Sequence, residues 1–490
     1  MTLVIHGATI LDGITEMPLK DRAIAIDGDR IRSIVPVSEL DRSLSSCERL
    51  DATGKFVIPG LLNANVHLLM DVRAENLLRY EGRFEALIEE AAQIALRSGV
   101  TTVFDTWGPR RALASVRDRI VRGEVPGSRI FCGGNIVGLD GPFSADFDFF
   151  NSKGAVSSAF ARRMNALWVE NVGRHLMWLT PEQVGSEVRK YIAGGINFVK
   201  YASNDHVPGA FLAFSPRAQE QIVARAHAAA LTAQAHTMSV EGLRIAIEAG
   251  CDLIQHANLT GPVPIPDETL KMFEARGISA VVFPQTERRL RSLMTADAYK
   301  EYRGEAEWLV SDQNVSRLIA SPTRLLLGTD GALMPAAAHD NSVVATGWNT
   351  SDTGSLFDLA TGHFYWLEAM EEKQCSPFRL LQAATHNVAA AYGMAKDLGS
   401  IRPGQYADMV ILDKDPYLQA KNFCSIYAVI KNGRVVNRDE LPLNPLLTAR
   451  SEAGEPEEAA YVPFISSLPY PSCLTCRPRQ IDDRSLSRKQ

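Results

Sequence analysis

The segment Asn197-Phe198-Val199-Lys200-Tyr201-Ala202 is a short apolar run with one lysine in it, and it lies between two helical patterns. The pattern before it opens at Thr180-Pro181-Glu182-Gln183, a capping box with proline at the first helical position, and closes at Gly194-Gly195. The pattern after it opens at Ser215-Pro216. Short apolar runs that alternate with helical patterns predict βα units with parallel strands.

The same alternation extends over residues 61–399. Eight βα repeats in about 340 residues are typical of a (β/α)8 TIM-like barrel with insertions. In that fold the active site is built at the carboxyl ends of the strands. The residues expected at these ends are His67, Thr106, Asn135, Lys200, His236, His256, Gln285 and Asp330.

Both ends of the chain have a different pattern. Residues 1–60 and 400–445 contain short strands separated by turns, such as the hairpin signal at Asp27-Gly28-Asp29. We expect them to form one small β-sandwich domain, with the barrel of residues 61–399 inserted between its halves. Residues 446–490 form a C-terminal extension, which is rich in Glu, Pro and Arg from about Ser451.

The composition excludes several classes of protein. The 490 residues are 46% hydrophobic and 22% charged with a net charge of −6, which gives no basic surface for nucleic acid and no polybasic stretch for a membrane. Seven scattered cysteines, no signal peptide and no long apolar run predict a cytoplasmic protein. The close pair Cys473 and Cys476 lies in the extension, without a second pair or a histidine nearby.

Five strand-end residues carry chemistry. Lys200 lies within an apolar strand and Asp330 follows one, and burying either charge requires a partner, a shifted pKa or a modification. A metal centre would satisfy both residues together with the histidines at the ends of three other strands. The candidate metal ligands are Asn65, His67, Lys200, His236, His256 and Asp330.

Two long loops are expected at the mouth of the barrel, from Asn135 to Thr180 and from Gly331 to Ser376. Both are rich in aromatic residues, which either bind an apolar or aryl substrate or pack the loops onto the barrel. His206 and His339 follow Lys200 and Asp330, and each is either a substrate contact or a surface histidine.

The order of these motifs resembles the amidohydrolase superfamily to about residue 440. The motifs that carry the resemblance are Val57-Ile58-Pro59-Gly60-Leu61-Leu62, Asn65-Val66-His67, Gly99-Val100-Thr101-Thr102-Val103, Lys200, His236, His256, Gly328-Thr329-Asp330-Gly331 and the stretch from Gly399 to Asp408. The resemblance implies one or two divalent metal ions, most often Zn²⁺, with Co²⁺ and Mn²⁺ as alternatives. It implies an N-carboxylated Lys200 as the bridging ligand, His236 and His256 at the second metal, and Asp330 as the catalytic base.

Asn65 departs from the His-x-His pattern of the superfamily. It is either a weaker metal ligand or a residue that only hydrogen-bonds behind the ligands. An Asn-x-His motif is similar to that of the phenylurea hydrolases and the related molinate hydrolase. That resemblance implies hydrolysis of the urea C–N bond in N-aryl-N′,N′-dialkyl ureas, giving an aromatic amine, a dialkylamine and carbon dioxide.

Other functions fit parts of this pattern. A thiocarbamate hydrolase and a prolidase-like or N-acyl amino acid amidase would share the motifs, although the amidase needs a group for the substrate carboxylate, with Arg73, Arg110 and Arg111 nearby. Deaminases of the superfamily generally lack the lysine of the fourth barrel strand, which is Lys200 here, so this residue argues against them. A metal-free scaffold protein is the non-enzymatic alternative. We expect a small aryl urea or carbamate as the substrate, and a homo-oligomer as the assembly.

Overall fold

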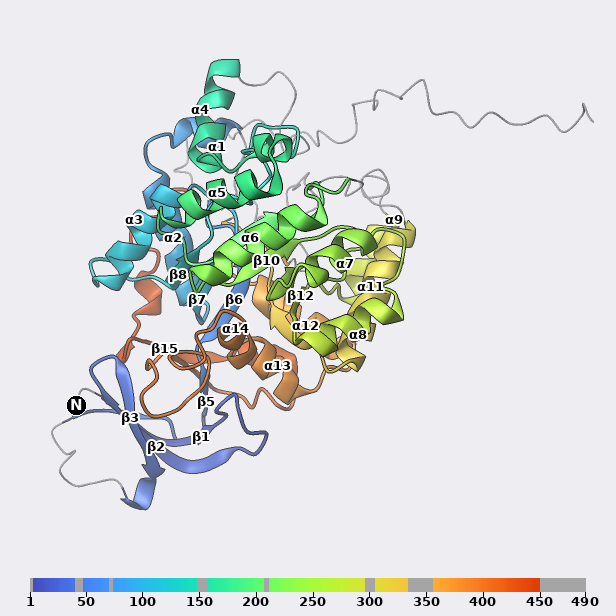
Figure 1. The fold of residues 1–490 in the computed structure, drawn as a ribbon. Coiled ribbons are helices and arrows are strands. Elements are labelled where there is room, and N and C mark those ends of the chain that lie inside the picture. The colour runs from blue at the N-terminus through green and yellow to red at the C-terminus, as the bar shows by residue number, and fades with distance from the viewer. Residues whose placement is uncertain are drawn as a thin grey trace, which may run out of the picture.

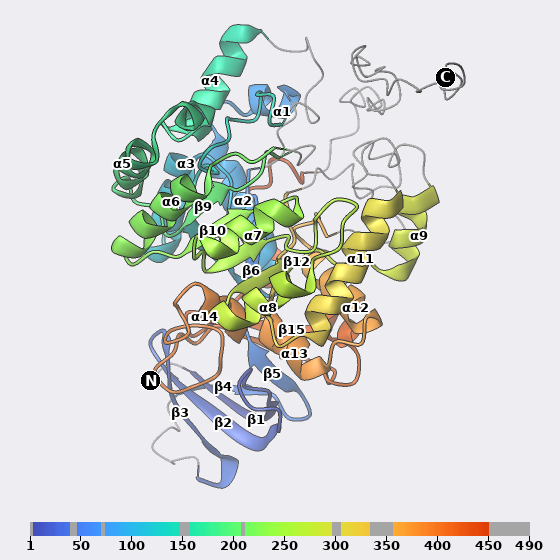
Figure 2. The same ribbon diagram turned by 45° about the vertical axis from the view of Figure 1, so that its right-hand side comes forward.

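The protein is described from a computed structural model that covers residues 3–39, 47–69, 74–147, 157–206, 211–295, 305–333 and 356–449. A layer of strands from the chain's N-terminal part lies below a larger body of strands and helices (Figure 1). Turning the view keeps this arrangement, with α13 (Pro377–Ala383) and α14 (His386–Ala391) above the strands of the small layer (Figure 2).

Eight parallel strands form the centre of the larger body, as the sequence predicts. They are β6 (Leu61–Val66), β7 (Val100–Asp105), β8 (Arg129–Cys132), β9 (Val199–Ala202), β10 (Ala233–His236), β11 (Leu253–Gln255), β12 (Ser279–Val282) and β13 (Arg324–Leu327). Helices pack around them: α1 (Ala74–Arg79), α2 (Phe84–Arg97), α3 (Arg110–Val121), α4 (Ser158–Val169), α5 (Pro181–Ile192), α6 (Pro216–Ala228), α7 (Val240–Glu248), α8 (Asp267–Arg276), α9 (Glu287–Thr295), α11 (Glu305–Ala320) and α12 (Gly362–Glu372).

The eight strands belong to two sheets, β6-β7-β8 and β13-β12-β11-β10-β9. The sheets meet at both seams through isolated bridges, Val66 with Gly331 and Val137 with Tyr201. The hydrogen-bonded ring is therefore not the fully closed barrel that the sequence predicts. A physical reason is visible at Asp330, whose φ of 48° turns the backbone away from the extended form required for a continuous ladder.

The small layer is one sheet that contains strands from both ends of the chain. Its order is β16-β15-β14-β5-β1-β2-β3, with β4 also paired to β1. The backbone of Ala407 donates to Asp29 O, and that of Ile31 to Gln405 O, so the sheet curls until its β3 edge meets the segment before β14. The strands are β1 (Leu3–Ile10), β2 (Leu19–Asp27), β3 (Arg30–Pro36), β4 (Glu48–Asp51), β5 (Phe56–Pro59), β14 (Met409–Leu412), β15 (Ile426–Lys431) and β16 (Arg434–Val435).

The helix starts agree with the sequence, whereas the loops do not. The capping box at Thr180 opens α5, and Ser215, Ser239 and Ser376 each cap a helix. The two segments expected to be loops contain α4 and α12. In α12 the buried residues lie on most sides of the helix, so its period is hard to recognise in the sequence; they include His363, Tyr365, Trp366, Leu367, Ala369 and Met370.

The C-terminal segment rests against α2. The buried carboxylate of Glu90 accepts hydrogen bonds from the backbone N–H groups of Leu446, Leu447 and Thr448 at 2.9–3.0 Å, and from the Thr448 hydroxyl. The first residues of the predicted extension are thus fixed to the barrel. In the described part of the chain, no helix has the length and apolar character needed to cross a membrane.

A buried ion pair joins the small sheet to the barrel. Lys431 on β15 bonds to Asp408 at 2.6 Å, and Arg129 on β8 approaches the same carboxylate at 3.4 Å. Burial lowers the pKa of Lys431 to about 8, and the charge of Asp408 opposes that shift. Asp408 therefore compensates two cations at the junction.

We predict that Asp408→Asn lowers the free energy of unfolding by about 3–5 kcal/mol, because it leaves buried cations without a counter-charge. Asp413→Asn is the matched control, since Asp413 pairs with Lys55 at 2.6 Å but its side chain is 50% exposed. We expect the control to cost about 0–1 kcal/mol. Urea denaturation followed by circular dichroism measures both, and equal losses would contradict the role of the junction.

Candidate active site

The predicted site residues gather at the carboxyl ends of the parallel strands. His67 directly follows β6, Lys200 is the second residue of β9, and His236 is the last residue of β10. His256 directly follows β11, and Asp330 lies three residues beyond β13. Residues far apart in the sequence therefore meet at one end of the strand ring, as parallel strand order requires.

The donors lie in two contacting pairs. His67 Nε2 is 3.3 Å from Asp330 Oδ1, and the ring centroids of His236 and His256 are 4.6 Å apart with the ring planes nearly perpendicular. His256 Nδ1 bonds to the carbonyl of Thr237 at 3.0 Å, which orients the ring with Nε2 on the opposite side.

Two of these residues have unusual backbone conformations. His256 has φ of 38° and Asp330 has φ of 48°, in the left-handed region that non-glycine residues rarely adopt. Such conformations cost of the order of 1–3 kcal/mol and concentrate at functional sites. Their presence just beyond β11 and β13, at the carboxyl ends of two strands of one sheet, supports a functional role for this end of the ring.

The electrostatic environment favours an ionised aspartate beside neutral imidazoles. Burial raises the pKa of Asp330, but the hydrogen bond from His67 and the charges of His67 and Lys200 outweigh it and bring that pKa to about 2. Burial lowers the pKa of His67, and burial together with the neighbouring His256 and His206 lowers the pKa of His236 well below its usual value. Neutral imidazole is the form that binds metal.

Lys200 is buried, with only 2% of its surface exposed. Its Nζ donates to Thr106 Oγ1 at 3.0 Å. Burial lowers the pKa of Lys200 to about 8, against the charges of Asp330 and Asp105. The lowered pKa increases the share of the neutral amine, which is the nucleophilic form.

Both polar atoms of the Asn65 side chain have partners within the protein. Oδ1 accepts from Thr106 Oγ1 at 2.5 Å, and Nδ2 donates to Gln255 Oε1 at 2.8 Å. Asn65 lies on β6 and is completely buried. It therefore bridges β7 and β11 beneath the histidines.

An aromatic wall surrounds the histidines, and we define it as Trp107, Phe147, Phe283 and Phe357. Trp107 meets the His67 ring edge-on at 6.0 Å and stacks on Phe147 at 4.1 Å. Phe283 lies 5.5 Å from His256 and 6.5 Å from Phe357. Phe147 and Phe357 come from the two segments expected to shape substrate specificity.

Of the two tentative substrate residues, one is placed at the site. The His206 ring lies between Phe147 at 4.5 Å and His236 at 5.2 Å, and burial lowers its pKa to about 3. His339, Arg73, Cys473 and Cys476 lie outside the described residues. Arg110 instead pairs with Glu170 at 2.5 Å.

Asp105 was not among the site residues identified from the sequence. It is the last residue of the apolar strand β7, a position similar to that of Asp330 just beyond β13. Its Oδ2 accepts from the backbone N–H of Leu68 at 2.7 Å, and its Oδ1 from that of Trp107 at 3.2 Å. Burial raises the pKa of Asp105 to about 8, against those two hydrogen bonds. The carboxyl group thus ties the residue after His67 to the aromatic wall.

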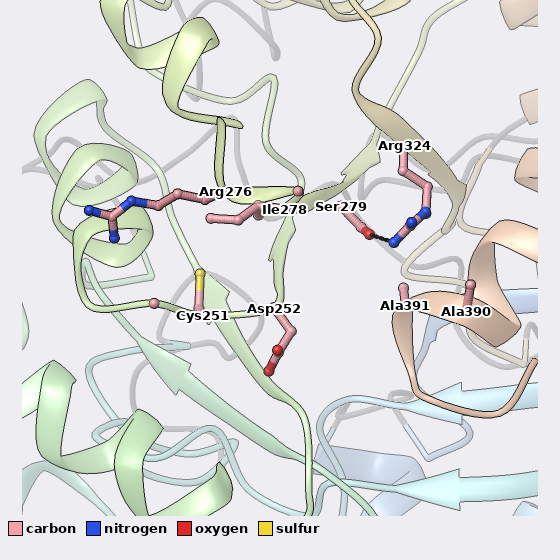
Figure 3. A pocket seen from close by; sticks show the side chains of 10 residues that line it. Cys251, Asp252, Arg276, Ile278, Ser279, Arg324, Ala390 and Ala391 are labelled. Carbon is pink, nitrogen blue, oxygen red and sulfur yellow. Dashed lines mark hydrogen bonds between the residues drawn. The ribbon is translucent and has the colours of Figure 1, made fainter. Parts of the chain in front are cut away.

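A cavity of about 220 Å³ lies at the other end of the strands and contains none of the predicted site residues. Its lining includes Asp252, Ser279 and Arg324, which stand at the starts of β11, β12 and β13, and Arg324 bonds to Ser279 (Figure 3). The geometry of the candidate site places its chemistry at the opposite, carboxyl ends.

The donor set fits a metal ion in part. Among the described residues, no three His, Cys, Asp or Glu side chains stand close enough to form a complete metal cage. Two prospective ligands, His67 Nε2 and Asp330 Oδ1, face each other at 3.3 Å. Nε2 of His236 fits a metal, since it is buried with no hydrogen-bond partner in the described part of the chain.

The sequence profile of the Amidohydrolase family matches residues 56–436. The chain belongs to this family. Two solved structures are similar over nearly the whole chain. Molinate hydrolase is 35% identical with a TM-score of 0.86, covering 93% of this chain and 98% of its own. Phenylurea hydrolase B is 33% identical with a TM-score of 0.84, covering 92% and 100%.

More distant proteins share less. A Xaa-Pro dipeptidase with a TM-score of 0.67 is 19% identical over 89% of this chain and 99% of its own, which is a likeness of fold. A dihydroorotase of Staphylococcus epidermidis is 35% identical over 103 residues, only 21% of either chain. A 5-methylthioadenosine/S-adenosylhomocysteine deaminase of Symbiobacterium thermophilum is 21% identical over 87% of this chain and 88% of its own.

We predict that Asp105→Asn destabilises the protein by about 1–3 kcal/mol at pH 5, because an amide offers one acceptor to two N–H groups. Between about pH 4 and 8 folded Asp105 holds a proton that the unfolded chain has released, so wild-type stability falls as pH rises. The variant lacks this dependence, and the difference between the two proteins should shrink towards pH 8.

Urea denaturation of both proteins from pH 5 to pH 8 measures this difference. Asp118→Asn is the control, because the Asp118 side chain is 50% exposed beside Arg117. A difference that stays constant with pH would show that the buried carboxyl group is already ionised at pH 5.

Proposed function

We propose that this protein is a metal-dependent amidohydrolase that cleaves the urea C–N bond of N-aryl-N′,N′-dialkyl ureas. The observation that carries the proposal is the cluster of buried imidazoles, Lys200 and Asp330 inside the aromatic wall. The likeness to molinate hydrolase and phenylurea hydrolase B over more than nine tenths of the chain supports it. The products would be an aromatic amine, a dialkylamine and carbon dioxide.

His67, His236, His256, Asp330 and an N-carboxylated Lys200 would hold one or two divalent ions. Zn²⁺ suits this mixed nitrogen and oxygen set, as do Co²⁺ and Mn²⁺. Bound there, a metal supplies a hydroxide equivalent at neutral pH and polarises the urea carbonyl. For an ion to bind both residues, the His67–Asp330 contact has to open.

The protein's own groups move the proton. Asp330 is ionised at neutral pH, so its carboxylate accepts a proton from the attacking water and passes it to the leaving nitrogen. Expulsion of an amine requires this protonation, because an amide anion is a very poor leaving group.

The aromatic wall would bind the aryl ring of the substrate. Flat apolar rings favour offset-stacked and edge-on contacts of the kind that Trp107 and Phe147 already make. His206 stands between Phe147 and His236, where it can contact the substrate next to the scissile bond. The wall also keeps bulk water away from the reacting carbonyl.

A thiocarbamate hydrolase is the second candidate, because molinate hydrolase is as similar to this chain as phenylurea hydrolase B. The amidase alternative rests on a likeness of fold to the Xaa-Pro dipeptidase. Cytoplasmic location, homo-oligomeric assembly and the domain boundaries remain predictions from the sequence.

We predict aniline release when the purified, Zn²⁺-supplemented protein is incubated with an N-aryl-N′,N′-dialkyl urea. Chromatography measures the aromatic amine, and a thiocarbamate and an N-acyl amino acid are tested in parallel. Turnover of the thiocarbamate alone would favour the second candidate. Turnover of the N-acyl amino acid without aniline release would refute the proposal.

We also predict that Lys200→Ala loses metal binding and activity together, because the variant removes the carboxylated ligand. Metal content by mass spectrometry and aniline release are the two measurements. Lys190→Ala is the control, since Lys190 lies on the outer face of α5 with its side chain 66% exposed. A metal-replete, active Lys200→Ala protein would refute the ligand role, and metal-free wild-type protein would support the scaffold alternative.

A further inference from the structure

A chain of hydrogen bonds begins at Lys200 and passes beneath the site, with longer side contacts from Gln255 Nε2 to Ala64 O at 3.4 Å and from the Tyr392 hydroxyl to Gln234 Oε1 at 3.5 Å. Lys200 Nζ on β9 donates to Thr106 Oγ1 at 3.0 Å, and Thr106 Oγ1 donates to Asn65 Oδ1 on β6 at 2.5 Å. All three side chains are buried, with Thr106 and Asn65 fully enclosed.

The chain of hydrogen bonds continues from Asn65 to the far side of the ring. Asn65 Nδ2 donates to Gln255 Oε1 at 2.8 Å, and Gln255 Nε2 donates to Gln234 Oε1. Gln234 Nε2 donates to the Tyr392 hydroxyl at 3.1 Å, which donates to the carbonyl of Ala64 at 2.8 Å. The chain of hydrogen bonds thus returns to β6, one residue from Asn65.

The two ends of this chain of hydrogen bonds fix the direction from donor to acceptor along it. The Lys200 ammonium has donors and no acceptor, whereas the Ala64 carbonyl has acceptors and no donor. The Thr106 hydroxyl carries one hydrogen and accepts from Lys200, so it must donate to Asn65, and the amides of Asn65, Gln255 and Gln234 each pass the same direction on by accepting with oxygen and donating with nitrogen. Hydrogen bonds aligned in one direction polarise and strengthen one another in a buried setting.

This direction determines which part of the Thr106 hydroxyl group faces the Lys200 nitrogen. The only hydrogen of the Thr106 hydroxyl is committed to Asn65 Oδ1, so an oxygen lone pair faces the lysine nitrogen. Asn65 can accept this hydrogen and continue the chain of hydrogen bonds, because its amide presents an acceptor to Thr106 and a donor to Gln255 at the same time. The amide is also neutral, and adds no charge beside the lysine.

We propose that Thr106 and Asn65 are positioning residues that hold the Lys200 nitrogen for N-carboxylation. This inference rests on the proposed function, because it assumes that Lys200 becomes a ligand. The neutral amine attacks the carbon of CO₂, an N–C bond forms as one C–O π bond opens to a carboxylate, and the nitrogen releases a proton to solvent. The N–H that remains still faces Thr106, so the carboxylate oxygens are left for metal.

The pair Thr106→Val and Thr106→Ser tests the proposal, since valine matches the shape of threonine without the hydroxyl and serine retains it. The carboxylated lysine is measured from its ¹³C carbonyl signal after equilibration with ¹³C-bicarbonate, and Zn²⁺ affinity by titration. We expect Thr106→Val to lose the carbonyl signal and bind Zn²⁺ about 10–100-fold more weakly. Thr106→Ser should recover both properties.

Ser128→Ala controls for the loss of a buried hydroxyl as such. Ser128 Oγ is fully buried and donates to Val100 O at 2.6 Å, at the opposite end of the strands. It should lower stability without changing the carbonyl signal or the affinity for Zn²⁺. A Thr106→Val protein with both properties unchanged would overturn the proposal while leaving the proposed function intact. Wild-type protein without the carbonyl signal would overturn both.

A second substitution separates positioning from direct metal binding by Asn65. If Asn65 acts through Thr106, then Asn65→Leu added to Thr106→Val should change Zn²⁺ affinity no further, because both break the same link. A further loss of tenfold or more in the double variant would show that Asn65 binds the metal itself. That result would overturn the positioning role of Asn65.

Discussion

The buried amine of Lys200 is the constraint on which the rest of the site depends. An ammonium in an apolar strand has to be compensated, and here the compensation comes from the charge of Asp330 and from the hydroxyl of Thr106. The pKa of about 8 that results keeps the amine close to the point where it can change its chemical form. The buried side chains of Thr106, Asn65, Gln255 and Gln234 form a chain of hydrogen bonds that starts at this one group.

The same end of the ring is where the ladder of strands is interrupted. Asp330 leaves the extended conformation just beyond β13, and only an isolated bridge joins Gly331 to Val66 beside His67. The interruption and the His67–Asp330 contact therefore occur at one place.

The sequence was sufficient for the framework of the site and insufficient for its connections. His67, Lys200, His236 and His256 could be assigned to strand ends because each follows or interrupts an apolar run. The partners of Asn65 could not, since nothing in a linear pattern relates it to Gln255, 190 residues away. Asp105 carried the same signal as Asp330 and was overlooked beside Thr106. The helix α12 was missed because its buried residues lie on most of its sides, whereas α4 was overlooked although Phe160, Met164 and Trp168 recur at helical spacing.

The small sheet has a consequence for how the protein is made. Its β5 strand pairs with β14, and Lys55 and Asp413 at that junction are separated by 358 residues. At about 5–20 residues per second, β5 waits roughly 20–70 s after leaving the ribosome before its partner strand is synthesised. During that interval an apolar edge is open to pairing with other chains. Translation rate and chaperone supply should therefore influence the yield of this protein.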